Sequence, residues 1–212
     1  YAARTGARAC VYRLTNVFGK WSRPNYNSAV ATFCHNIARD LPITVSDPSH
    51  ELRLVYIDDV VRCFLDAMAG REQCEGELCL AGPERCITLG ELVARLRSFR
   101  QERDTLEVPD SSDPLTRQLY ATYLSFLPED GFAWPVTTHA DARGSFTELL
   151  RLGGHGQVSV NIARPGITKG QHWHHTKHEK FIVVSGTGVI RFRQVGGDKV
   201  LCYPVSGDPI TV

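Results

Sequence analysis

The alternation of apolar and polar positions in the first sixty residues predicts strands and helices in turn. Residues 8–14 have the composition of a strand and are followed by the turn-rich segment 15–19. Apolar positions then recur at helical spacing over residues 28–40, and Pro42 ends the pattern. Residues 52–57 alternate well enough to form a second strand. This order indicates an α/β unit with a largely parallel sheet.

Two further helices are predicted from their starting residues. Asp58 or Asp59 is a candidate N-cap for a helix whose apolar face carries Val60, Val61, Phe64, Leu65 and Met68. Thr88, with Glu91 three residues later, has the spacing of a capping box and opens another helix.

The pattern changes in the last third of the chain. From residue 136, short β-like runs separated by glycine turns predict an all-β sandwich or jelly roll. These runs are 157–162, 181–184 and 189–192. Residues 100–135 are charged and contain proline and a short amphipathic stretch, which suits a connection between domains. We therefore expect an α/β domain over 1–115, a linker over 116–135 and a β domain over 136–212.

Composition excludes several classes of protein. Of 212 residues, 42% are hydrophobic and 22% charged, a balance that excludes a wholly disordered chain. The net charge of +1 gives no support for nucleic-acid binding, and the short apolar runs exclude a membrane-spanning helix. Seven cysteines without dense, regular spacing are interpreted as reduced thiols of a cytoplasmic protein. Cys74, Cys79 and Cys86 fit no common zinc pattern.

A family resemblance rests on two motifs of the first part. Arg13-x-x-Asn16-Val17-Phe18-Gly19, followed by Val55-Tyr56-Ile57-Asp58-Asp59-Val60-Val61, resembles the C-terminal half of an extended short-chain dehydrogenase/reductase. In sugar-nucleotide members of that family, the asparagine matching Asn16 contacts the ligand, and Asn27 falls where another contact is often made. Both could instead be turn residues whose side chains satisfy nearby backbone groups.

The first part also departs from that family. Leu52 stands where many members have a diphosphate-binding arginine, and Arg53 lies one place along, on the opposite face of a strand. The sequence contains no glycine-rich phosphate loop and no Tyr-x-x-x-Lys pair. We therefore expect NADPH to be bound mainly by residues that precede Tyr1.

The sharpest chemical signal is a histidine-rich segment. His172, His174, Glu179 and Gly186 match the first cupin signature, His-x-His-x(4)-Glu-x(6)-Gly, in residue type and spacing. On a strand, His-x-His directs both imidazoles to the same face, and a carboxylate can complete a site for zinc, iron, manganese or nickel. We assign His172, His174 and Glu179 as metal ligands, with zinc the expected metal. The alternative is a histidine-rich surface turn or a sugar site without metal.

A second cupin resemblance makes the role of His172 less simple. Asp141-x-Arg143-Gly144-x-Phe146-x-Glu148 and Lys169-Gly170-x-His172 look like elements of the deoxysugar-nucleotide 3,5-epimerases. In those enzymes the histidine matching His172 is a base and not a ligand. The complete His/His/Glu pattern favours metal binding here.

A reductase part joined to a cupin part resembles the bifunctional capsular-polysaccharide enzymes of the CapF type. That resemblance implies a UDP-activated amino deoxysugar as substrate, epimerised at C3 by the cupin domain and reduced at C4 with NADPH, toward UDP-N-acetyl-L-fucosamine. It implies an α/β fold followed by an all-β cupin jelly roll that is incomplete at its C-terminus, and a homodimer. Lys177 is the candidate catalytic acid or base, although an exposed turn lysine is the competing interpretation. A metal-dependent cupin oxygenase and a non-catalytic sugar-nucleotide-binding protein remain alternatives.

Overall fold

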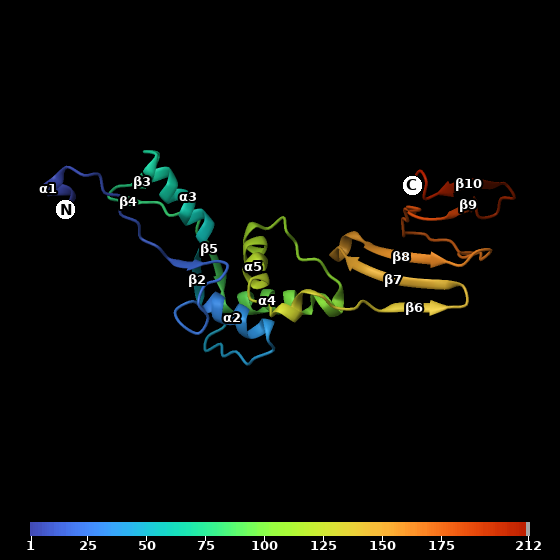
Figure 1. The fold of residues 1–212 in the computed structure, drawn as a ribbon, viewed down its shortest axis with the longest axis horizontal. Coiled ribbons are helices and arrows are strands. Elements are labelled where there is room, and N and C mark those ends of the chain that lie inside the picture. The colour runs from blue at the N-terminus through green and yellow to red at the C-terminus, as the bar shows by residue number, and fades with distance from the viewer. Residues whose placement is uncertain (211–212) are drawn as a thin grey trace. The chain divides into compact units, whose positions relative to one another are not determined.

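The computed structural model describes residues 1–210, and these divide into two compact units, one of residues 1–165 and one that begins at Gly166. The first unit contains α1 (Ala2–Thr5), β1 (Asn16–Phe18), α2 (Ala29–Ala38), β2 (Glu51–Tyr56), α3 (Ile57–Met68), β3 (Cys74–Glu75), β4 (Leu78–Cys79), β5 (Arg85–Thr88), α4 (Leu89–Thr105), α5 (Pro114–Leu124), η1 (Glu129–Phe132), β6 (Thr138–Asp141), β7 (Gly144–Arg151), η2 (Gly153–His155) and β8 (Gln157–Ala163). The second contains β9 (Thr187–Arg193) and β10 (Val200–Ser206). Figure 1 shows these elements along the chain.

A three-stranded sheet and three helices form the core of the first unit. The strand order is β1-β2-β5, with β1 and β2 parallel and β5 antiparallel to β2. Apolar residues of α2, α4 and α5 pack against the sheet in a single buried cluster. An α/β part followed by antiparallel β-structure is therefore confirmed, although only one of the two pairings in this sheet is parallel.

The first strand lies later in the sequence than predicted. Residues 8–14 form only an isolated bridge, between Tyr12 and Cys79, because their backbone meets a partner at that point alone. The strand itself, β1, occupies part of the segment predicted as a turn, and pairs Asn16 with Leu54 of β2. The prediction for residues 8–14 was wrong.

Helix starts follow the predictions with one exception. Ser28 caps α2 by accepting a hydrogen bond from the Ala31 amide. Thr88 and Glu91 form the predicted capping box, with both reciprocal hydrogen bonds present. Neither Asp58 nor Asp59 caps α3, because β2 runs directly into the helix and places both aspartates in its first turn.

The predicted linker contains a helix of the core. α5 begins at Pro114 after the cap Asp113, and Leu119 and Tyr123 on its inner face are buried. The amphipathic stretch within residues 116–135 therefore packs into the first unit, where its apolar positions complete the cluster with α2 and α4.

The hairpin of β3 and β4 changes the interpretation of the cysteines. Cys74 and Cys79 lie opposite each other in the hairpin and are joined in a disulfide. The expectation that all seven cysteines are free thiols was therefore wrong for this pair. The tight turn, in which Gly76 has a φ of 63°, brings together two residues separated by four others.

The C-terminal strands form two small antiparallel sheets. One has the order β6-β7-β8, and the other pairs β9 with β10. Arg151 at the end of β7 also exchanges backbone hydrogen bonds with Leu106 and Val108, which attaches the first of these sheets to the segment after α4. This attachment explains why the compact units divide after Pro165 and not at residue 136.

The strand predictions for this part were right in two places out of three. Residues 157–162 lie in β8 and residues 189–192 in β9, whereas residues 181–184 lie in the loop before β9. Among residues 1–210, no helix combines the length and apolar character needed to cross a membrane.

Candidate functional site

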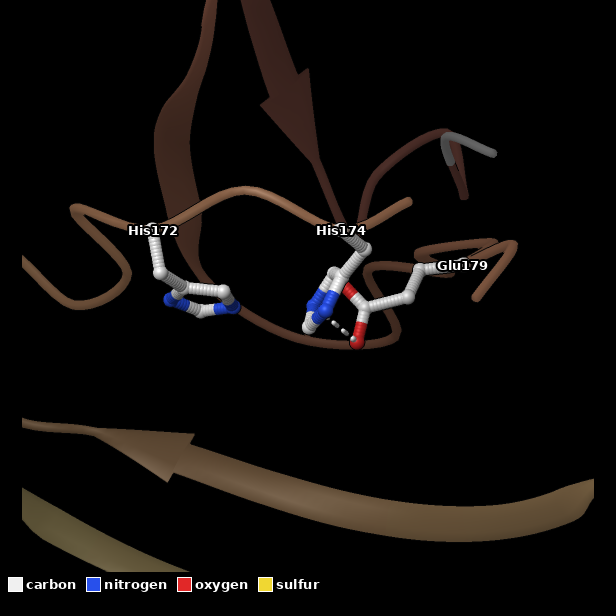
Figure 2. A group of neighbouring side chains, drawn as sticks. All are labelled: His172, His174 and Glu179. Atoms are coloured by element: carbon white, nitrogen blue, oxygen red, sulfur yellow. Dashed lines mark ion pairs between the residues drawn. The ribbon is translucent and has the colours of Figure 1, made fainter. Parts of the chain in front are cut away.

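The histidine motif lies in the loop between β8 and β9. Residues 171–180 form no strand, so the prediction that His-x-His occupies a strand was wrong. Gly170, with a φ of 99°, and Gln171, with a φ of 62°, turn the backbone immediately before His172 and prevent a regular strand there. The loop nevertheless directs the side chains of His172 and His174 toward Glu179 (Figure 2).

The three predicted ligands come together in this loop. Their potential ligand atoms all lie within 4.8 Å of one another. The rings of His172 and His174 meet edge to face with centroids 4.7 Å apart, and Nε2 of His174 is 3.7 Å from Oε1 of Glu179. Two imidazole nitrogens and one carboxylate oxygen are a donor set that suits a first-row divalent metal ion.

The arrangement fits a metal ion after small side-chain movements. Two ligands bound tetrahedrally to zinc at about 2.1 Å are about 3.4 Å apart, so separations of up to 4.8 Å require shifts of about an ångström. All three residues are exposed, and their side chains have room to make such shifts.

Lys177 forms an ion pair with one of the candidate ligands. Its Nζ lies 2.6 Å from Oε1 of Glu179. This hydrogen bond is the main reason why the pKa of Glu179 lies below its ordinary value, with smaller contributions from the charges of Lys177 and the two histidines. The carboxylate is therefore held in its ionised, metal-binding form, while Lys177 competes with a metal ion for it.

The other aromatic residues of the motif do not belong to the cluster. Trp173 and His175 pack edge to face with ring centroids 4.4 Å apart. Neither His175 nor His178 is part of the three-residue group. These two histidines therefore provide matched controls for the candidate ligands.

The predicted sugar-nucleotide contacts belong to the other unit. Asn16 opens β1, is exposed, and donates a hydrogen bond from Nδ2 to the backbone oxygen of Arg53 at 3.0 Å. One amide hydrogen thus satisfies nearby backbone, as the turn-residue interpretation expects, and the bond fixes the direction of the carboxamide. Asn27 is exposed and immediately precedes Ser28, the N-cap of α2.

The charged residues of the epimerase-like motif pair within their own sheet. Arg143 holds Asp141 through two side-chain hydrogen bonds of 2.7 and 2.9 Å. Glu148 accepts two from Arg151, at 2.8 and 2.9 Å. The first pair spans the turn between β6 and β7, and the second lies along β7. None of these side chains belongs to the metal-ligand cluster.

A cavity in the first unit was missed by the sequence analysis. Arg62, Arg85 and Arg117 line it, and they come from three separate elements. Arginines so far apart in sequence form no motif. The helical spacing of Pro114, Arg117, Gln118 and Ala121 on α5 was the available signal, because it places them on one face.

Two protein-family models match the two ends of the chain. The NAD dependent epimerase/dehydratase family matches residues 1–78, and the polysaccharide biosynthesis C-terminal domain matches residues 139–212. A curated protein of Pseudomonas aeruginosa, UDP-2-acetamido-2,6-beta-L-arabino-hexul-4-ose reductase, is 50% identical over 190 residues. The matched region is 90% of this chain but 51% of the reductase, so the chain spans about half the length of that relative.

Solved structures extend the similarity to almost the whole chain. The capsular polysaccharide assembling protein CapF from Staphylococcus aureus is 48% identical, with a TM-score of 0.93 over 99% of this chain and 58% of that one. CapF with the inhibitor 3-isopropenyl-tropolone gives 48% identity and a TM-score of 0.95, over 99% of this chain and 62% of that one. The resemblance inferred from the motifs is therefore confirmed: the chain is similar to CapF over part of that protein, and it matches part of the epimerase/dehydratase family and the polysaccharide biosynthesis C-terminal domain.

Proposed function

We propose that the chain is part of a two-step enzyme that acts on a UDP-activated 2-acetamido-2,6-dideoxy-4-ketohexose. The C-terminal part epimerises C3, and the N-terminal part takes part in reduction of the C4 ketone with NADPH, toward UDP-N-acetyl-L-fucosamine. The observation that carries the proposal is the grouping of His172, His174 and Glu179 in a chain that is 50% identical to a UDP-hexulose reductase.

The C-terminal part supplies the groups for proton removal beside a ketone. His172, His174 and Glu179 would hold zinc, and a bound zinc ion would supply positive charge beside an oxygen on which negative charge develops. Lys177 is the candidate acid or base at C3, and a second group on the opposite face of the sugar would complete the epimerisation. Its Nζ lies 2.6 Å from Oε1 of Glu179, beside the candidate ligands.

The N-terminal part supplies contacts to the sugar nucleotide. Asn16 and Asn27 are exposed carboxamides, which can donate hydrogen bonds to sugar or phosphate oxygens without adding charge. The 212 residues contain no glycine-rich phosphate loop, so the fit of this chain to NADPH is incomplete. We expect no detectable NADPH-dependent reduction by the 212-residue chain alone.

The metal site is tested by ligand substitution. His172→Ala and His174→Ala should each reduce zinc per chain to near zero, because each removes one of few protein ligands. His175→Ala and His178→Ala, from the same loop, should retain it. Atomic emission of the purified chain measures the metal, and equal loss in the His175 variant would refute the assignment.

The chemistry is tested by hydrogen exchange at the sugar. The zinc-loaded chain should incorporate deuterium at C3 of a 4-keto sugar nucleotide at a low rate, and Lys177→Gln should abolish this while retaining zinc. Exchange that persists in Lys177→Gln would remove Lys177 from the mechanism. Bound iron with oxygen consumption would instead support the oxygenase alternative, and a chain with zinc but without exchange would support simple binding.

The sugar-nucleotide contact is tested separately. Asn16→Ala should weaken binding of the UDP-sugar, measured by titration calorimetry. Asn36→Ala, which removes an exposed carboxamide bond to the Pro42 backbone on the same unit, is the matched control. Unchanged affinity in the Asn16 variant would leave only its hydrogen bond to Arg53 as its role.

A further inference from the structure

A cavity of about 410 Å³ lies at the carboxyl end of β2 in the first unit. Tyr56, in its wall, is the last residue of β2 and pairs with Phe18, the last residue of the parallel strand β1. Ligands of open α/β sheets bind beyond the carboxyl ends of parallel strands. The position of the cavity therefore makes it a candidate binding site.

Three elements contribute positive charge to this cavity. Arg62 comes from α3, Arg85 from the start of β5 and Arg117 from α5. Asp58 and Asp59 also line the cavity, so its charged lining has three arginines and two aspartates. Both carboxylate oxygens of Asp59 are engaged within the wall. Oδ1 accepts from Arg62 and Oδ2 from the Gln118 amide, each at 3.1 Å.

Two polar atoms of the cavity wall are buried without a hydrogen-bond partner. They are the Nε donor of Arg85 and the Oε1 acceptor of Gln118. A buried polar group that makes no hydrogen bond is unfavourable, so a native structure normally provides it with one. A molecule that serves both atoms must present an oxygen that accepts from a guanidinium and a hydroxyl that donates to a carbonyl oxygen.

We propose that this cavity binds a phosphoryl group of a hydroxylated ligand. Phosphate oxygens accept strong, charge-assisted hydrogen bonds from arginine, and a neighbouring hydroxyl of the same ligand donates to Gln118. A sugar nucleotide and a nicotinamide dinucleotide share this chemistry. The proposal rests on the proposed function only in the choice of these two ligands, and it does not depend on the metal site.

The test compares three arginine variants of the 212-residue chain. Binding of inorganic phosphate, UDP and NADPH is measured by titration calorimetry at low salt. Arg85→Gln should weaken phosphate and UDP binding about tenfold or more, because it removes a charge-assisted hydrogen bond from a partly buried site. Arg117→Gln should act in the same direction, and it provides a second variant should Arg85→Gln fail to fold. Arg97→Gln, on the exposed side of α4, is the matched control and should bind as the parent chain does.

The outcomes separate the proposal from its alternatives. Loss of affinity for UDP but not NADPH in the Arg85 and Arg117 variants identifies the sugar nucleotide as the ligand, and the reverse identifies the dinucleotide. Unchanged affinity for all three probes in both variants would overturn the proposal, as would equal weakening in Arg97→Gln. His172→Ala should leave phosphate binding intact, so failure of the metal site and failure of this cavity are distinguishable.

Discussion

The two halves of the chain differ in where their apolar side chains lie. From Phe18 to Phe126, residues of the sheet and of α2, α4 and α5 form one buried cluster, in which Leu96 and Leu119 are fully enclosed. Among residues 132–210, no side chain is buried, and Val160 and Phe192 are 42% and 54% exposed. The first half is therefore held by its own core, whereas the candidate metal site depends on contacts within one loop.

The largest predicted effect is the loss of stability when a side chain of the buried core is truncated. Leu119→Ala should lower the free energy of unfolding by about 2–5 kcal/mol, because it opens a cavity among fully enclosed neighbours. Val160→Ala on β8 should cost less than about 1 kcal/mol, since its side chain already contacts water. Urea denaturation of both variants gives the two values. Similar losses would show that the β8 face is covered in solution.

Zinc should stabilise the loop that carries the histidine motif, and so reduce the difference in stability between the two halves. A ligand that binds only the folded state stabilises it by about 2.7 kcal/mol when its free concentration is 100 times the Kd. We therefore expect amide hydrogen exchange in the loop carrying the motif to slow when zinc is added and to recover with a chelator. The His175→Ala chain should respond in the same way and the His174→Ala chain should not. Protection that spread equally to α4 would contradict a local effect.

What the sequence predicted also differs between the halves. Helix starts such as Ser28 and Thr88 could be predicted because a cap is a local interaction between residues three apart. β1 was misplaced, since which backbone finds a partner depends on Leu54, far along the chain. The place of α5 in the core could not be seen from residues 116–135 alone, because it depends on the complementary faces of α2 and α4.

The candidate site shows the same limit. The spacing of His172, His174 and Glu179 was sufficient to predict that they meet, since all three lie within one short loop. The spacing could not show that Lys177 pairs with Glu179, or that Gly170 and Gln171 replace the expected strand with a turn. The sequence indicated only one face of the cavity, through the spacing on α5, because only the fold brings Arg62, Arg85 and Arg117 together.

A smaller effect is expected from local hydrogen bonds. Thr88→Ala removes the cap of α4 and one half of its capping box, and should cost about 1 kcal/mol of stability. Thr138→Ala removes an exposed hydroxyl contact of 2.8 Å with Thr147 between β6 and β7, and should cost about 0.5 kcal/mol or less. Thermal unfolding monitored by circular dichroism ranks the two variants. A larger loss of stability in Thr138→Ala than in Thr88→Ala would contradict the expectation that such hydrogen bonds contribute more in the first half.

The smallest expected effect is the contribution of one carboxyl group of the first half, that of Asp113, to the dependence of stability on acid. The pKa of Asp113 is lowered in the folded chain, mainly by the hydrogen bond from the Thr116 hydroxyl, with backbone hydrogen bonds from the start of α5 acting in the same direction. A carboxyl group with a lowered pKa stabilises the folded state above its unfolded value, near pH 4, and loses that contribution as the pH falls through the folded value. The contribution of Asp113 to the free energy of unfolding should thus stay level from pH 7 to about pH 5 and decline below about pH 4. Asp113→Asn keeps a cap acceptor but cannot titrate, so its free energy of unfolding should decline less steeply in acid than that of the parent chain.

The control is Asp198→Asn, between β9 and β10, which removes an exposed carboxylate from the other half and should leave the slope of unfolding free energy against pH unchanged. Urea denaturation at half-unit steps of pH measures all three chains, and an equal decline in the parent and Asp113→Asn chains would show that the hydrogen bonds of this cap contribute nothing to acid sensitivity.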